Sequence, residues 1–268
     1  MDSIIQSQIT IEYHSPEQVY RHGKRLEGMT FRDVLNLGIV PEGVTREYNS
    51  RRYKGGMGTL IEERFFGYKA NSDRMADFAE AGVELKATCI DRRKNGSDVA
   101  GERLVLTMIP YDEEAPLSLY DSHLWHKCQK MLLVWYRRDK TIDAYDQRIE
   151  HVLLFTPPVE DLRIIEADYR QITDLIRAGR ADELSESLTT YLGACTKGAT
   201  RAKSMRDQSF YAPGHTFITM LALEGVHPRL MQELAGHSDP QTSMKVYTHV
   251  NLDAKRQAVN TMSKVFVA

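Results

Sequence analysis

The sequence predicts an α/β (α+β) fold in which a mixed central sheet is flanked by helices, followed by a short all-helical C-terminal segment. Two observations predict the first part: apolar, strand-like runs recur along the chain, and stretches with helix caps or helical periodicity lie between them. A third predicts the helical segment, because β-like alternation stops near residue 214. We therefore expect one domain over residues 1–213 and a helical segment over residues 214–268.

Helix-start and helix-stop signals define the expected helices. Ser15-Pro16-Glu17-Gln18 is typical of a capping box with proline at the first helical position, and it predicts a helix that ends near Gly28. Thr30 begins a second short helix, which Gly38 ends. The glycine-rich residues 54–58 lead into a third helix, closed by Gly67. Further helices are expected over residues 122–129 and 160–176.

The expected strands are apolar runs bounded by turn residues. Residues 83–90 and 103–110 are strand-like and are separated by a charged, turn-rich stretch. Residues 131–136 and 151–155 are apolar enough for buried strands, and a further strand is expected over residues 191–195. Strands that alternate with helices in this way favour a central sheet with helices packed on it.

The segment Asp77-Phe-Ala-Glu-Ala-Gly-Val-Glu84-Leu-Lys86 carries the clearest candidate for chemistry. Side chains alternate faces along a strand, so Glu84 and Lys86 are expected to point the same way while Leu85 enters the core. Asp77, Glu84 and the Leu85 carbonyl could hold a hard cation such as Mg²⁺, and Lys86 could act on an attacking water. PD-(D/E)xK nucleases build their metal site in this way. The alternative is an amphipathic strand edge with ordinary salt bridges, since a Glu-x-Lys triplet is common by chance.

Composition limits the function classes. The net charge of −2 does not indicate a global positive field, so contact with DNA would depend on local basic clusters such as Arg46, Arg51, Arg52 and Lys54. The three cysteines are scattered without a CxxC pair, which suits a reduced compartment and a cytoplasmic protein. No apolar run approaches the roughly 18 residues that a membrane span needs, and the N-terminus has no signal-peptide pattern.

Several segments together resemble the family of MutH and the GATC-cutting type II restriction endonucleases. In chain order they are Lys54-Gly-Gly-Met-Gly-Thr-Leu-Ile-Glu62-Glu63-Arg-Phe-Phe-Gly67, Asp77-Phe, Ala81-Gly-Val-Glu-Leu-Lys86-Ala-Thr, Glu102-Arg-Leu-Val-Leu-Thr-Met-Ile109, Ser122-His-Leu-Trp-His-Lys127 and Tyr191-Leu-Gly-Ala-Cys-Thr-Lys197-Gly-Ala199. They cover residues 15–213, and the combination is specific although each piece alone is not.

The resemblance implies a restriction-endonuclease-like fold, dependence on Mg²⁺ and hydrolysis of double-stranded DNA at or beside GATC. It implies that Asp77 and Glu84 are metal ligands, that Lys86 is the catalytic lysine, and that Lys127 is a second active-site lysine. Cutting both strands with one site per chain would then require sequential nicking or a transient dimer on DNA.

The same resemblance implies a helix carboxylate and several DNA contacts. Counting from Gly58 selects Glu62 as that carboxylate, whereas counting back from Gly67 selects Glu63, because one extra residue lies in this helix. Glu62 is preferred. Lys54, Lys197 and Arg201 are the expected DNA-binding residues, with ordinary surface positions as the alternative.

The C-terminal segment resembles something else, the end of a tyrosine recombinase of the phage integrase family. The similar segments are His215-Thr-Phe-Ile-Thr, Glu224-Gly-Val-His, Leu234-Ala-Gly-His237-Ser and Val246-Tyr247-Thr-His249-Val. In that family His237 and Tyr247 would be catalytic. The HxxR box, however, is replaced here by Tyr211-Ala-Pro-Gly214, so the arginine that neutralises the phosphate is absent and we expect no recombinase activity.

This junction leaves three hypotheses for the whole chain. The first is a Mg²⁺-dependent endonuclease. The second is a catalytically impaired DNA-binding fusion protein, because an Arg- and Lys-bearing recognition strand and a closing helix would normally follow Lys197 and are replaced by foreign sequence. The third is a recombinase remnant that forms a covalent DNA adduct through Tyr247.

Overall fold

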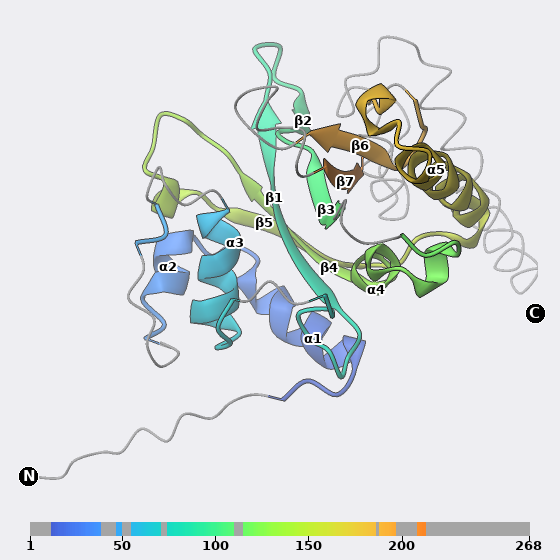
Figure 1. Cartoon of the computed structure of the whole chain (residues 1–268). Coiled ribbons are helices and arrows are strands. Elements are labelled where there is room, and N and C mark those ends of the chain that lie inside the picture. Colours follow the sequence, from blue (N-terminus) through green and yellow to red (C-terminus); the bar gives the residue numbers. More distant parts are fainter. Residues whose placement is uncertain are drawn as a thin grey trace, which may run out of the picture. The chain divides into compact units, whose positions relative to one another are not determined.

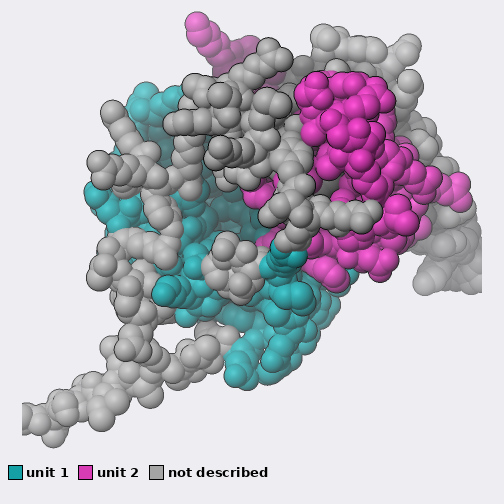
Figure 2. All heavy atoms as spheres, viewed as in Figure 1, with its two compact units in different colours: residues 1–89, 129–155 teal, residues 90–128, 156–268 magenta. Residues whose placement is uncertain are grey.

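The computed structural model describes residues 12–38, 47–49, 55–70, 74–109, 115–185, 188–196 and 208–212. The chain divides into two units, each made from two separate stretches (Figure 2). Unit 1 contains residues 1–89 and 129–155, and unit 2 contains residues 90–128 and 156–268. The expected boundary near Pro213, the helical segment beyond it and the basic residues Arg46, Arg51, Arg52 and Lys54 lie outside the described residues, so these stay predictions.

Unit 1 begins with two short helices whose caps follow the sequence signals. Ser15 caps α1 (Pro16–Gly23), with its hydroxyl accepting from the Gln18 amide at 3.3 Å. A 3₁₀ turn, η1 (Lys24–Leu26), extends the helix toward Gly28. Thr30 and Asp33 form a reciprocal capping box at α2 (Phe31–Leu35). Both predicted helix starts are confirmed.

The third helix contains a π-helical turn that the sequence did not predict. It begins as α3 (Gly56–Leu60) and continues directly as η2 (Ile61–Phe65), where the Phe66 amide donates to the Ile61 carbonyl at 3.1 Å. Gly67, with a φ of +77°, follows its end as expected. A π turn accommodates one additional residue within a helix. It therefore explains why counting from the two ends of this segment selected different glutamates.

The central sheet has the strand order β2-β1-β4-β5 (Figure 1). Its strands are β1 (Glu84–Arg92), β2 (Asp98–Ala100), β4 (Met131–Arg137) and β5 (Ile149–Phe155). β4 and β5 pair antiparallel, with Met131 opposite Phe155, and the end of β1 pairs antiparallel with β2. This mixed sheet with flanking helices confirms the predicted fold class, although β2, within the charged stretch, was not predicted.

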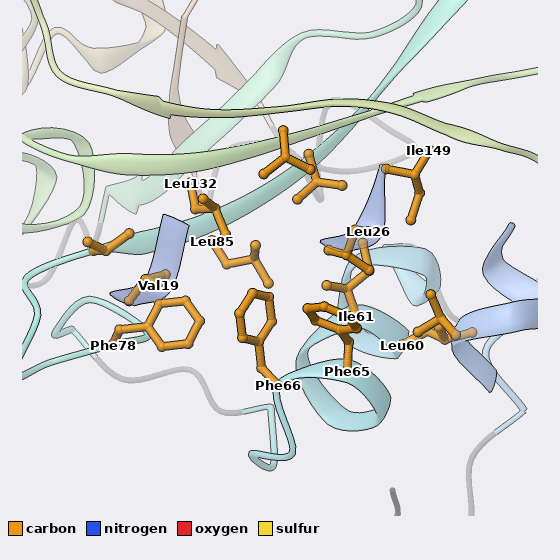
Figure 3. Close-up of a cluster of buried hydrophobic side chains, with 14 of the residues drawn as sticks. Val19, Leu26, Leu60, Ile61, Phe65, Phe66, Phe78, Leu85, Leu132 and Ile149 are labelled. Carbon is orange, nitrogen blue, oxygen red and sulfur yellow. The ribbon is translucent and has the colours of Figure 1, made fainter. Parts of the chain in front are cut away.

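The core of unit 1 lies between the sheet and these helices (Figure 3). Phe66 packs edge-on against both Phe65 and Phe78, with ring centroids 5.0 and 4.9 Å apart. Gly23 of α1 lies so close to β4 that a Cβ there would come 2.8 Å from Leu132 Cδ2. Five successive residues of β4, Met131 to Trp135, are buried, as the apolar run predicted.

Unit 2 contains a second, antiparallel sheet in the order β3-β7-β6. Its strands are β3 (Leu104–Ile109), β6 (Gly193–Thr196) and β7 (Gln208–Ala212), and its helices include α4 (His123–Cys128) and α5 (Val159–Arg177). β7 corrects an expectation, because we inferred that the strand after Lys197 was lost. A strand is present between β3 and β6, but its sequence Gln-Ser-Phe-Tyr-Ala has no lysine or arginine. No helix among the described residues has the length and apolar composition needed to cross a bilayer.

Asp168 connects α5 to the segment that leads into β6. Its buried carboxylate accepts the main-chain amides of Thr190, Tyr191 and Leu192, the last at 2.9 Å. Asp168→Ala would leave these amides without their acceptor, so we expect a loss of about 2–4 kcal/mol in the free energy of unfolding. Asp174→Ala, on the exposed face of the same helix, is the control and should cost less than about 0.5 kcal/mol. Denaturant unfolding of both variants checks this, and equal losses would contradict it.

Candidate functional site

A tight turn brings Asp77 beside Glu84. The Phe78 amide donates to the Val83 carbonyl at 2.9 Å, and the Val83 amide returns a bond to the Phe78 carbonyl at 3.3 Å. Gly82 has a φ of +63°, a conformation that glycine adopts without strain. Two hydrogen bonds then join the flanks: the Asp77 amide donates to Glu84 Oε2 at 3.2 Å, and the Leu85 amide donates to Asp77 Oδ2 at 2.8 Å. The turn thus fixes both carboxylates in one place.

Glu84 and Lys86 extend from the same face of β1, as the alternation predicted. Lys86 Nζ lies 2.6 Å from Glu84 Oε1, while Leu85 is buried in the core. The Glu84 side chain is 3% exposed and that of Lys86 is 20% exposed, so the ion pair lies at the edge of the buried region. The Glu84 amide donates to the Lys130 carbonyl at 3.0 Å, which anchors this end of β1 beside β4.

The π-helical turn gives the two adjacent glutamates different surroundings. Burial raises the pKa of Glu62 to about 7, and the nearby negative charges of Asp77 and Glu84 add to the rise while Lys86 opposes it. Glu63 is fully buried and accepts a hydrogen bond from the Tyr48 hydroxyl at 2.8 Å. Glu62 therefore shares the electrostatic environment of Asp77, Glu84 and Lys86, whereas Glu63 is bound to Tyr48.

Glu62 should make the stability of the protein depend on pH. Its folded pKa of about 7 exceeds the ordinary 4.5, so between these values the folded chain holds a proton that the unfolded chain has released. The stabilisation is complete below the unfolded pKa and is lost as pH rises through the folded pKa. Without divalent cations, we expect the melting temperature to fall from about pH 4.5 to about 7, and Glu62→Gln to remove that contribution. Glu160→Gln, at an exposed carboxylate, is the control; an unchanged slope in Glu62→Gln would contradict the assignment.

Tyr68 belongs to the same region, and sequence reasoning missed it. Its hydroxyl oxygen is buried, and burial raises the pKa of this phenol well above its ordinary value, with Asp77, Glu62 and Glu84 adding to the rise. The tyrosine directly follows Gly67, which the sequence marked only as the end of a helix. No residue pattern singled it out.

The donor set suits a hard divalent cation. Asp77 and Glu84 contribute two carboxylates with separate anchoring bonds, and their negative charges add to the burial that raises the pKa of Glu62. Among the described residues, there is no group of three or more His, Cys, Asp or Glu side chains that could hold a metal ion. The ligands would therefore be two carboxylates, completed by oxygen atoms such as the Leu85 carbonyl.

For the remaining candidates, a position at this site stays a prediction. Lys127 lies on α4 in unit 2, so its place beside Asp77 and Glu84 stays a prediction. Five other candidates lie outside the described residues: Lys54, Lys197, Arg201, His237 and Tyr247.

Comparisons with known proteins show which proteins this chain is similar to. The family model of the DNA mismatch repair enzyme MutH matches residues 66–168, which include Asp77, Glu84, Lys86 and Lys127. The chain is 40% identical to the type II restriction enzyme Sau3AI of Staphylococcus aureus over 163 residues, or 60% of this chain. That match spans only 33% of the length of Sau3AI.

Two MutH proteins are similar over a larger share of both chains. The DNA mismatch repair protein MutH of Actinobacillus pleuropneumoniae is 27% identical over 197 residues, covering 72% of this chain and 82% of that protein. MutH of Klebsiella pneumoniae is 28% identical over 209 residues, covering 77% and 84%. The chain is thus similar both to a type II restriction enzyme and to DNA mismatch repair proteins. These similarities do not bear on the recombinase-like segment.

Proposed function

We propose that the chain is a Mg²⁺-dependent DNA endonuclease of the type II restriction kind, which hydrolyses phosphodiester bonds at or beside GATC. The observation that carries this proposal is that three hydrogen bonds link Asp77, Glu84, Leu85 and Lys86 at the start of β1. The similarities to Sau3AI and MutH support a nuclease, and the resemblance of the ordered sequence segments supports GATC as the target.

Asp77, Glu84 and the Leu85 carbonyl would hold the cation, which supplies a Lewis acid that polarises the phosphate and acidifies a bound water. Lys86 already lies within hydrogen-bonding distance of Glu84, so its ammonium is placed to orient that water or to stabilise negative charge on the phosphate. Glu62 adds a third carboxyl group beside Asp77 and Glu84, and burial raises the pKa of Glu62 to about 7 in the absence of the cation. Lys127 would act as a second lysine near the scissile phosphate.

Double-stranded DNA is the proposed partner. Lys54, Lys197 and Arg201 would contact its phosphates, and a transient dimer on DNA would allow both strands to be cut. These residues and the dimer follow from the family resemblance alone.

The direct test is cleavage of plasmid DNA by the full chain. We expect a plasmid rich in GATC to be cut in the presence of Mg²⁺, and a matched plasmid without GATC to remain intact. Cleavage of both would refute the target sequence, and cleavage of neither would refute the nuclease. A version that ends at Pro213 tests whether the recombinase-like segment limits recognition.

The sequence of β7 favours a second candidate, a DNA-binding protein with impaired catalysis. The strand is present but carries no lysine or arginine, so it lacks the basic side chains expected of a recognition strand. This candidate predicts that the protein retards DNA in a salt-dependent manner without cutting it. Cleavage that requires GATC would exclude it.

A further inference from the structure

Tyr68 connects the helix that carries Glu62 with the turn that carries Asp77. Its main-chain amide donates to the Glu62 carbonyl at 3.2 Å, beyond the π-helical turn. Its ring meets the ring of Phe78 edge-on, with centroids 5.4 Å apart, and Phe78 directly follows Asp77. The backbone of Tyr68 is thus held by Glu62 itself, and its ring is held by Phe78, the residue that follows Asp77.

The Tyr68 hydroxyl is unusual among the buried tyrosine hydroxyls. Those of Tyr48, Tyr169 and Tyr191 each donate to an oxygen of the protein. The Tyr68 hydroxyl is buried and has no hydrogen-bond partner within the part of the chain that the structure describes. A buried hydroxyl without a partner costs stability, which favours a role for it other than folding.

Burial raises the pKa of this hydroxyl, and the negative charges of Asp77, Glu62 and Glu84 add to the rise, with Asp77 contributing the most of the three. Asp77 Oδ2 already accepts the Leu85 amide. A phenol is a neutral donor at physiological pH, so it can orient a carboxylate without neutralising the charge that a cation needs. A further donor on Asp77 would help to fix the direction in which this carboxylate presents its oxygen atoms.

We propose that Tyr68 is a positioning residue of the nuclease site, whose hydroxyl donates to the Asp77 carboxylate, directly or through one water, when the site holds its cation. The inference rests on the proposed function, because it assigns Asp77 as a metal ligand. Groups that orient metal ligands in this way typically change metal affinity or activity by about 10–100-fold when removed.

The test is Tyr68→Phe in the full chain, which deletes only the hydroxyl. In the absence of divalent cations we expect the melting temperature to rise by about 2–4 °C, because an unsatisfied buried group is removed. In a Mg²⁺ titration followed by thermal stability, we expect the midpoint to move to about 10-fold higher concentration or more, and cleavage at low Mg²⁺ to weaken in parallel. Tyr48→Phe deletes the same atom where it is paired with Glu63, and its melting temperature should fall.

The outcomes separate this proposal from the function on which it rests. If wild type binds Mg²⁺ and cleaves DNA but Tyr68→Phe has the same Mg²⁺ midpoint, the role of Tyr68 is refuted and the nuclease stands. If wild type binds Mg²⁺ without cleaving DNA, a shifted midpoint in Tyr68→Phe still supports the positioning role. If Mg²⁺ changes neither stability nor cleavage of the wild type, both proposals fail.

Discussion

Lys86→Ala is expected to lower the rate of plasmid cleavage by about 10²–10⁴-fold, the range for loss of a positioned proton-transfer or charge-stabilising group. The substitution removes the ammonium that lies 2.6 Å from Glu84 Oε1 at the start of β1. Initial rates on supercoiled plasmid at saturating Mg²⁺ measure the effect. Lys140→Ala, at an exposed lysine of the same unit, is the control and should retain the wild-type rate.

Because Glu84 is buried, Lys86→Ala also removes its counter-charge and should lower stability. Lys86→Arg separates the two effects, since a guanidinium preserves the ion pair but replaces a compact ammonium with a planar fork that would hold the water and the phosphate differently. We expect Lys86→Arg to melt near the wild-type temperature but to cleave DNA more slowly than wild type, as Lys86→Ala does. Cleavage by Lys86→Ala at the wild-type rate would remove the basis for the proposed nuclease site.

Gly56→Ala is expected to destabilise the protein by about 3 kcal/mol, because there is no space for a side chain at the start of α3. A Cβ at Gly56 would lie 1.9 Å from the Tyr48 carbonyl oxygen and 2.9 Å from its carbon. Both are backbone atoms, so the contact cannot be relieved by turning a side chain. Unfolding in guanidinium chloride measures the loss, and cleavage should fall with it, because α3 leads into the turn that carries Glu62.

Gly58→Ala is the matched control on the same helix. There a Cβ would meet Ala87 Cβ at 3.7 Å, an ordinary contact. Alanine is a better helix former than glycine, so we expect a gain of about 0.5–1 kcal/mol. If the two variants lost the same stability, close packing against Tyr48 would not be the reason for the glycine at position 56.

The features that sequence could predict are those set by short stretches of chain. Ser15 and Thr30 cap their helices because a capping hydroxyl needs only an amide two or three residues away. Glu84 and Lys86 share a face because strand side chains alternate. The strands at residues 131–136 and 151–155 followed from apolar runs, and their pairing confirmed them.

The features that sequence could not predict depend on distant contacts. The choice between Glu62 and Glu63 was open because a π turn leaves no residue signature, and the partner of Glu63 is Tyr48. Tyr68 was missed because its position near Asp77 arises from packing against Phe78. The strand β7 was missed because its sequence lacks the lysine and arginine expected of the strand after Lys197, whereas its pairing with β3 and β6 depends on the backbone.

The turn between Asp77 and Leu85 also bears on the order in which the protein folds as it is synthesised. The bonds that join Asp77 to Glu84 and Leu85 span only seven and eight positions, so they can form as soon as this segment emerges. The support of Glu84 by the Lys130 carbonyl requires β4, which is translated only after residues 90–128 of the other unit. The carboxylates can thus be paired early in a nascent chain, but they become buried and rigid only once β4 is available.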